Sequence, residues 1–123
     1  MTADDFRQRL RQLFPTLEAF LASSFFSPDD SPYTPHRLCS EFTTFYLQHV
    51  DDYDAPEIIE LFRLIEVIVV ADPFDRDPLA NAVLTCFLEN ISYTRAGEAG
   101  RVHMGSASAA FFAGWHGPPP YQR

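Results

Sequence analysis

Apolar side chains recur at helical spacing in two consecutive stretches of the chain, residues 54–71 and 77–91. In the first stretch they fall three or four residues apart, on one face of a helix: Ile58, Leu61, Phe62, Ile65, Ile68 and Val69. The second stretch has the same spacing at Leu79, Val83, Cys86, Phe87 and Ile91. The β-branched run at 67–70 continues a helical pattern and no other segment could pair with it as a strand, so helix is favoured. The two stretches predict a pair of core helices that the rest of the chain covers.

Both core helices have recognisable starting residues. Asp54-Ala55-Pro56-Glu57 predicts a capping box, with Asp54 as the N-cap and Pro56 in the first turn, where a missing N–H costs nothing. Asp77-Pro78 repeats the cap and the proline. Asp72-Pro73 ends the first helix, because the residue before a proline avoids the α region. Phe74, in the turn between the helices, is expected to cover their ends.

Three further helical regions flank this pair. The first begins at Thr2 or Asp4 and is interrupted by Pro15. Its inner residues are Phe6, Leu10, Leu13 and Phe14, and Arg7, Arg9 and Arg11 are expected to face water. The second begins at Thr34-Pro35, with an inner face of Leu38, Cys39, Phe42, Phe45, Tyr46 and His49 and an outer face of Thr43, Thr44 and Gln48. The third begins at Ser106 and would dock through Phe111, Phe112 and Trp115.

The remaining segments have the composition of loops. Residues 23–35 are rich in Ser, Pro and Asp, and Phe25 and Phe26 within them either pack on the core or form an exposed contact. Residues 92–100 are polar and contain Gly97 and Gly100, which predicts a loop. The chain is therefore expected to be one all-α domain over residues 1–123. We expect a bundle of about five helices, with antiparallel helical hairpins packed in repeat-like fashion and an extended tail at 116–123.

Charge narrows the range of partners. The chain of 123 residues has 17 acidic and 9 basic residues and a net charge of −8. Nucleic acids and anionic membranes require a positive surface, so neither is expected as a partner. The residues after Met1 lack the basic start and apolar core of a signal peptide, and the longest apolar run, 67–71, is far shorter than the ~20 residues that span a bilayer. A cytoplasmic protein is expected.

No motif specific to catalysis or to a cofactor is present. The four histidines share no metal-ligand spacing. Asp51, Asp52 and Asp54 lack the glycine and the terminal Glu of a calcium-binding loop, so solvated turn residues are favoured. Cys39 and Cys86 are expected to be small buried side chains, and a disulfide would require their helices to touch at that level. Catalytic, cofactor-binding and metal-binding residues are therefore not expected.

Polar residues that interrupt the core helices allow two interpretations. Asn81 and Glu66 could tie the two helices together by hydrogen bonds, because buried polar groups need partners. Alternatively, the carboxylates of this region form an acidic recognition surface. The contact residues of such a surface would be Asp51, Asp52, Asp54, Glu57, Glu60, Glu66 and Glu89.

The pattern Leu61-Phe62…Ile65-Glu66, followed by Asn81-Ala82-Val83…Phe87-Leu88-Glu89-Asn90 and by Met104-Gly105-Ser106-Ala107-Ser108, resembles a family of small bacterial all-helical proteins. Some proteins of this kind are immunity partners of secreted toxins. The resemblance implies a non-enzymatic protein that neutralises a toxin by covering a basic surface. The alternatives are a structural or adaptor subunit that uses Phe25, Phe26 and Trp115, and a small enzyme with Glu66, Glu89 and His49 between its helices.

Overall fold

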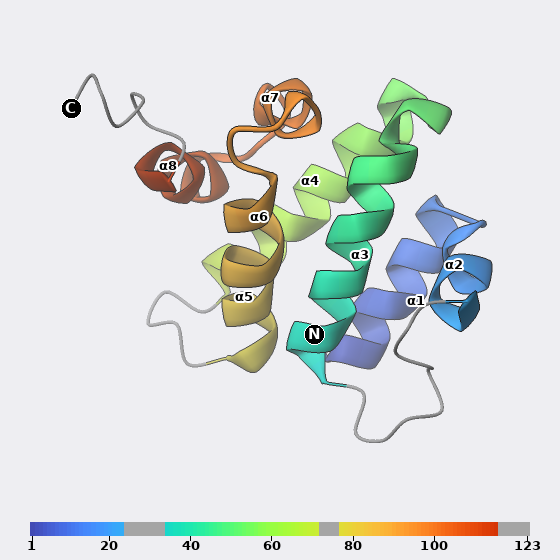
Figure 1. Ribbon diagram of the computed structural model, residues 1–123. Coiled ribbons are helices and arrows are strands. Elements are labelled where there is room, and N and C mark those ends of the chain that lie inside the picture. The colour runs from blue at the N-terminus through green and yellow to red at the C-terminus, as the bar shows by residue number, and fades with distance from the viewer. Residues whose placement is uncertain (24–33, 72–76, 116–123) are drawn as a thin grey trace.

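The computed structural model describes residues 1–23, 34–71 and 77–115, and every regular element in these ranges is helical (Figure 1). The all-α class is confirmed, although about five helices was an underestimate. The elements are α1 (Ala3–Leu13), α2 (Leu17–Ser23), α3 (Pro35–His49), the 3-10 turn η1 (Val50–Asp52), α4 (Ala55–Val70), α5 (Pro78–Ala82), the π-helix η2 (Val83–Leu88), α6 (Glu89–Ile91), α7 (Arg95–Arg101) and α8 (Ser106–Trp115). The predictions for Phe25, Phe26, Phe74 and the tail concern residues outside the described ranges.

Most of the predicted helix starts are confirmed. Thr2 caps α1 in a capping box with Asp5, Thr34 accepts from the Arg37 amide, and Asp77 accepts from the Leu79 amide. The capping box predicted at Asp54 is wrong, because Asp54 is the N-cap of α4 but its side chain makes no capping hydrogen bond. Proline occupies the second position of that helix, which removes one of the two amides that an N-cap side chain normally reaches.

Pro15 separates α1 from α2, as predicted, and an ion pair holds the two helices together. Arg7 donates from Nε and Nη2 to the two carboxylate oxygens of Glu18 at 3.0 and 2.9 Å, and Arg11 Nε lies 3.4 Å from the same carboxylate. The expectation that Arg7 faces water was wrong, since only 23% of its side chain is exposed. The bidentate geometry fixes the angle between the helices on either side of the break.

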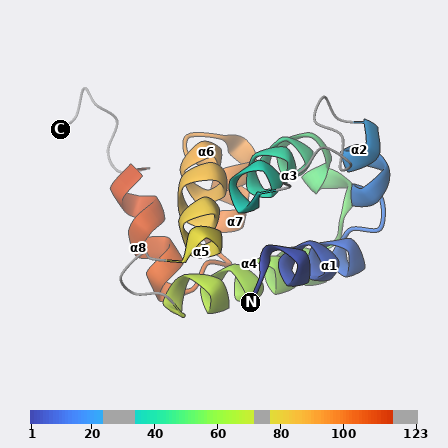
Figure 2. The same cartoon turned by 90° about the horizontal axis from the view of Figure 1, so that it is seen from below.

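The helices form two layers (Figure 2). One layer contains α3 beside the continuous rod of α5, η2 and α6, and the other contains α4 and α1. The rod contacts α4, as the predicted core pair requires, but it packs more extensively on α3. In Figure 1, α3 and the rod run in the same direction, so this contact is parallel, whereas α4, the predicted hairpin partner of the rod, runs obliquely in the opposite direction.

A buried hydroxyl joins α3 to the rod. Thr43 Oγ1 lies 2.8 Å from the Cys39 carbonyl oxygen and 2.5 Å from that of Cys86, and the Asn90 amide nitrogen also donates to the Cys86 carbonyl at 3.0 Å. The Cys86 carbonyl, which belongs to the π-helix, thus accepts hydrogen bonds from two side chains. Thr43 was expected to face outward, but it is only 5% exposed, because the rod of α5, η2 and α6 packs over that side of α3.

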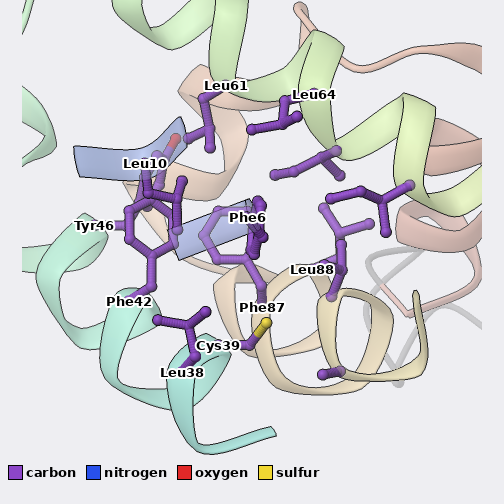
Figure 3. Close-up of a cluster of buried hydrophobic side chains, with 14 of the residues drawn as sticks. Phe6, Leu10, Leu38, Cys39, Phe42, Tyr46, Leu61, Leu64, Phe87 and Leu88 are labelled. Atoms are coloured by element: carbon purple, nitrogen blue, oxygen red, sulfur yellow. The ribbon is translucent and has the colours of Figure 1, made fainter. Parts of the chain in front are cut away.

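Aromatic rings fill the space between the layers (Figure 3). The ring of Tyr46 lies edge-on to Phe87 at 5.2 Å and to Phe62 at 6.1 Å, and Phe42 lies 5.4 Å from Phe87. The Tyr46 hydroxyl donates to the Ala96 carbonyl at 3.0 Å. Burial, together with the nearby charge of Asp51, raises the pKa of Tyr46, so the phenol remains a neutral donor.

Residues 95–101 form α7, so the loop predicted for 92–100 is wrong over most of its length. Thr94 caps α7 by accepting from the Gly97 amide. A Cβ on Gly97 would lie 1.9 Å from the Ile91 carbonyl oxygen, and one on Gly100 would lie 2.6 Å from Phe62 Cζ. These glycines do not break the helix; they allow its backbone to lie directly against the core.

We expect Gly100→Ala to lower the free energy of unfolding by about 1–3 kcal/mol, because the added methyl group overpacks the contact with Phe62 and Tyr46. The measurement is urea denaturation followed by circular dichroism. Gly114→Ala in α8 is the matched control. Its Cβ would meet nothing within 4 Å, so stability should be unchanged or rise by up to about 1 kcal/mol. Equal effects of the two substitutions would contradict the close approach of α7.

Candidate functional site

Aromatic contacts with the core hold the turn between α3 and α4 in place. The Tyr53 ring lies perpendicular to that of Phe14 at 4.8 Å, and its hydroxyl is 2.5 Å from Thr16 Oγ1. The His49 ring packs against Phe45 at 5.1 Å and Phe20 at 5.9 Å. The apolar residues of the turn thus point towards α1 and α2, and its carboxylates are left on the outside.

We call the four carboxylates at this turn, Asp51, Asp52, Asp54 and Glu57, the acidic corner. The three aspartates are exposed and Glu57 is half-buried. Arg95, at the start of α7, pairs with Asp51 at 2.5 Å. The hydrogen bond from Arg95 and its positive charge lower the pKa of Asp51. Four carboxylates against one guanidinium leave a formal charge of −3 on the acidic corner.

Within residues 1–23, 34–71 and 77–115, the other members of the acidic corner have no comparable cation. Asp52 lies 3.3 Å from His49 Nδ1, an imidazole that is charged only when protonated. Asp54 caps α4 without using its side chain. Glu57 lies in the first turn of α4, and its Oε2 is buried without a hydrogen bond. The exposed carboxylates of Asp52 and Asp54 are therefore available to a positive group on another molecule, whereas Glu57 offers only its less buried oxygen.

Glu60 and Glu66 were also predicted as contact residues, but the structure engages both within the chain. Glu60 pairs with Arg63 at 3.0 Å on the surface of α4, and Arg9 of α1 lies 3.8 Å away. Glu66, half-buried on α4, binds the start of α8. Its carboxylate accepts from the amides of Ala107 and Ser108, both at 2.9 Å, and from Ser108 Oγ at 2.7 Å.

Glu66 thus caps a helix from a distant part of the sequence. Ser108 is fully buried, and a Cβ on Gly105 would lie 2.3 Å from Glu66 Cδ, so the chain passes directly over the carboxylate. Ser106 was predicted to cap α8, but it is the first residue of the helix. The prediction that Glu66 and Asn81 tie the two core helices together is also wrong. Glu66 binds α8, and Asn81 accepts from Thr85 within its own helix.

The residues of the enzyme alternative lie in different places. His49 is at the acidic corner, Glu66 is bonded to α8, and Glu89 is half-buried in α6. His49 and Glu66 are 17 positions apart in the sequence. The part of α4 between its start at Ala55 and Glu66 alone is about 16 Å long, at a rise of about 1.5 Å for each residue. No contact joins the three among the residues described, and α6, which contains Glu89, lies apart from the turn between α3 and α4 (Figure 1).

The described residues contain two shallow surface hollows, but no metal-binding group and no membrane-spanning helix. Residues 1–23, 34–71 and 77–115 contain no group of three or more His, Cys, Asp or Glu side chains placed to hold a metal ion. Two shallow hollows lie along α1, and both are lined by Gln8 and Gln12. In the same ranges no helix has the length and apolar character needed to cross a bilayer.

Sequence reasoning missed two charged residues. Arg95 was assigned to a loop, and nothing in the local sequence indicates that it meets Asp51, 44 positions earlier. Glu41 is buried in α3 at 7% exposure. It lies between Leu38 and Phe42 on the inner face, and this spacing is a signal that could have revealed it.

Comparison with known proteins adds no assignment: the chain matches no protein-family model, no curated protein and no solved structure.

We expect Glu66→Gln to lower the free energy of unfolding by about 1–3 kcal/mol, because a glutamine amide cannot accept all three hydrogen bonds from α8. Glu60→Gln, the same substitution on an exposed pair of the same helix, should cost at most about 1 kcal/mol. Chemical denaturation of the two variants compares them directly. Equal losses would contradict the capping role of Glu66.

The contribution of Glu66 should also depend on pH. Burial by itself would raise the pKa of Glu66, but the hydrogen bonds from Ser108 and from the Ala107 amide outweigh it and lower the pKa below its ordinary value of 4.5. The unfolded chain therefore binds this proton more tightly. The stability difference between the wild type and Glu66→Gln should be constant from about pH 7 to about pH 5 and shrink as the pH falls below about 4.5. A difference that grows in acid would contradict this assignment.

Proposed function

We propose that this chain is a protein-binding domain whose acidic corner docks on a basic surface of another protein. The observation that supports the proposal is the exposure of Asp51, Asp52 and Asp54 at one turn, with Arg95 as the counter-charge. Complementary charge accelerates the encounter of two proteins and aligns them. Because Tyr53 and His49 pack against core aromatic rings, the backbone of the turn is already held in place, and it would lose little conformational entropy on binding.

The resemblance described above makes the proposal more specific. Some of the small helical bacterial proteins that the sequence resembles are immunity partners, so the basic surface would belong to a toxin. In this proposal the domain is a cytoplasmic inhibitor that covers the toxin and performs no reaction of its own. The contact residues would be Asp52 and Asp54 first, with Asp51 and Glu57 beside them. Glu60, Glu66 and Glu89 become less suitable, since the first two are engaged within the fold and the third lies apart from the corner.

A structural or adaptor subunit is the second candidate, and an exposed apolar stripe on α4 favours it. Ile59, Val67 and Val70 lie along one side of this helix and are 39%, 54% and 54% exposed. Exposed apolar side chains in a row mark contact surfaces more often than isolated ones do. The Phe25 and Phe26 of the original hypothesis lie outside the described residues. Association through this stripe would be insensitive to salt, whereas association through the acidic corner would weaken as salt rises.

The test is to produce the chain with the products of the genes that flank its own and to measure any complex by calorimetry at increasing salt. The proposal expects one of these products to bind, with an affinity that falls as salt rises. Asp52→Asn/Asp54→Asn should weaken this binding by at least about tenfold, or about 1.4 kcal/mol. The proposal fails if no flanking product binds, or if the affinity is independent of salt.

Asp4→Asn/Asp5→Asn is the matched control. It removes two charges from the first turn of α1, which lies at the opposite end of the molecule from the acidic corner (Figure 1). Its effect on affinity should be small, although its effect on net charge is the same. Equal losses from the two double variants would show that overall charge, and not the acidic corner, controls binding.

A further inference from the structure

The two cysteines of the chain lie on opposite sides of the contact between α3 and η2. Cys39 belongs to α3 and Cys86 to η2. The hydroxyl oxygen of Thr43 is 2.8 Å from the carbonyl oxygen of Cys39 and 2.5 Å from that of Cys86. A single atom therefore joins the main chains of the two cysteines. The two helices touch at the level of the cysteines, which is the condition for a bond between them.

The two thiols differ in their exposure to solvent, and this difference sets the order in which they could react. Cys39 is 1% exposed and lies beside Phe87 of η2 in the core (Figure 3). Cys86 is half-buried, and its sulfur lies 3.8 Å from Thr85 Oγ1. Burial, and after it the neighbouring Cys86, raises the pKa of Cys39. Cys86 is thus the thiol that solvent reaches, and Cys39 is the one that lies behind it.

We propose that Cys39 and Cys86 form a reversible disulfide across the α3–η2 contact, through exchange with small-molecule disulfides such as glutathione disulfide. The structure describes both cysteines as free thiols, so the proposal concerns a bond that would form on oxidation. A disulfide requires the two Cα atoms to come within about 4.4–6.8 Å. The proposal therefore requires that α3 and η2 bring these two Cα atoms within that range in the oxidised protein.

The exchange takes two steps. The Cys86 thiolate attacks one sulfur of glutathione disulfide; the sulfur–sulfur bond breaks and one glutathione thiolate leaves. The Cys39 sulfur then attacks the Cys86 sulfur, the mixed disulfide bond breaks, and the departing glutathione thiolate takes the proton of the Cys39 thiol. Together the two cysteine thiols lose two electrons and two protons, and glutathione disulfide is reduced to two molecules of glutathione.

The test is to equilibrate the full chain with mixtures of reduced and oxidised glutathione, block the remaining thiols by alkylation and measure the intact mass. The expected product is a monomer that has lost two hydrogen atoms and carries no alkyl group. The same titration in urea measures the pairing of the two cysteines in the unfolded chain. We expect the equilibrium constant for disulfide formation to be at least about tenfold larger in the folded protein, which is a potential about 30 mV more negative.

Two results would overturn the proposal. One is a folded protein that accumulates only the mixed disulfide of Cys86 with glutathione. The other is an equilibrium constant no larger in the folded protein than in urea. Cys39→Ala is the control, because it should stop at the mixed disulfide on Cys86. The comparison of folded and unfolded wild type requires no variant, so it remains decisive even if Cys39→Ala folds poorly.

Discussion

The contact of α3 with the rod of α5, η2 and α6 determines where the other helices can lie. Its centre is the Thr43 hydroxyl, which donates to the Cys86 carbonyl of the π-helix. Beside it, Phe42, Tyr46 and Phe87 fill the interface with rings that meet edge-on or tilted. Removing this contact would take one of two side-chain hydrogen bonds from the Cys86 carbonyl and would expose large apolar side chains of the core, and the second loss is the costlier.

Two smaller helices attach to this centre by different means. α7 approaches through glycine, and the Tyr46 hydroxyl reaches across to its Ala96 carbonyl. α8 is held by the carboxylate of Glu66, which takes the place of a local cap, and by the fully buried Phe112. A charged acceptor at a helix N-terminus satisfies orphan amides and also interacts favourably with the helix dipole. Both attachments depend on side chains that lie far away in the sequence.

The fold thereby sorts the carboxylates into two groups. Glu18, Glu60 and Glu66 are used to join helices, through arginines or through backbone amides. Asp52 and Asp54 project from a turn whose Tyr53 ring packs against Phe14. Among the described residues, neither aspartate forms an ion pair with an arginine or accepts a hydrogen bond from the backbone of another helix. A net charge of −8 describes the whole chain, and in the proposed function the second group is where a basic partner would meet that charge.

The sequence by itself determined the helices, because helix starts and apolar spacing are local properties. Thr2, Thr34 and Asp77 were identifiable as caps, Pro15 as a break, and the inner face of α3 from its spacing. Gly97 and Gly100 misled the prediction, because glycine favours loops unless a neighbouring helix requires its small size. The roles of Thr43, Glu66 and Arg95 were decided only by tertiary structure. Their partners lie 41 to 44 positions away along the chain, and the spacing of local residues carries no information about contacts at that distance.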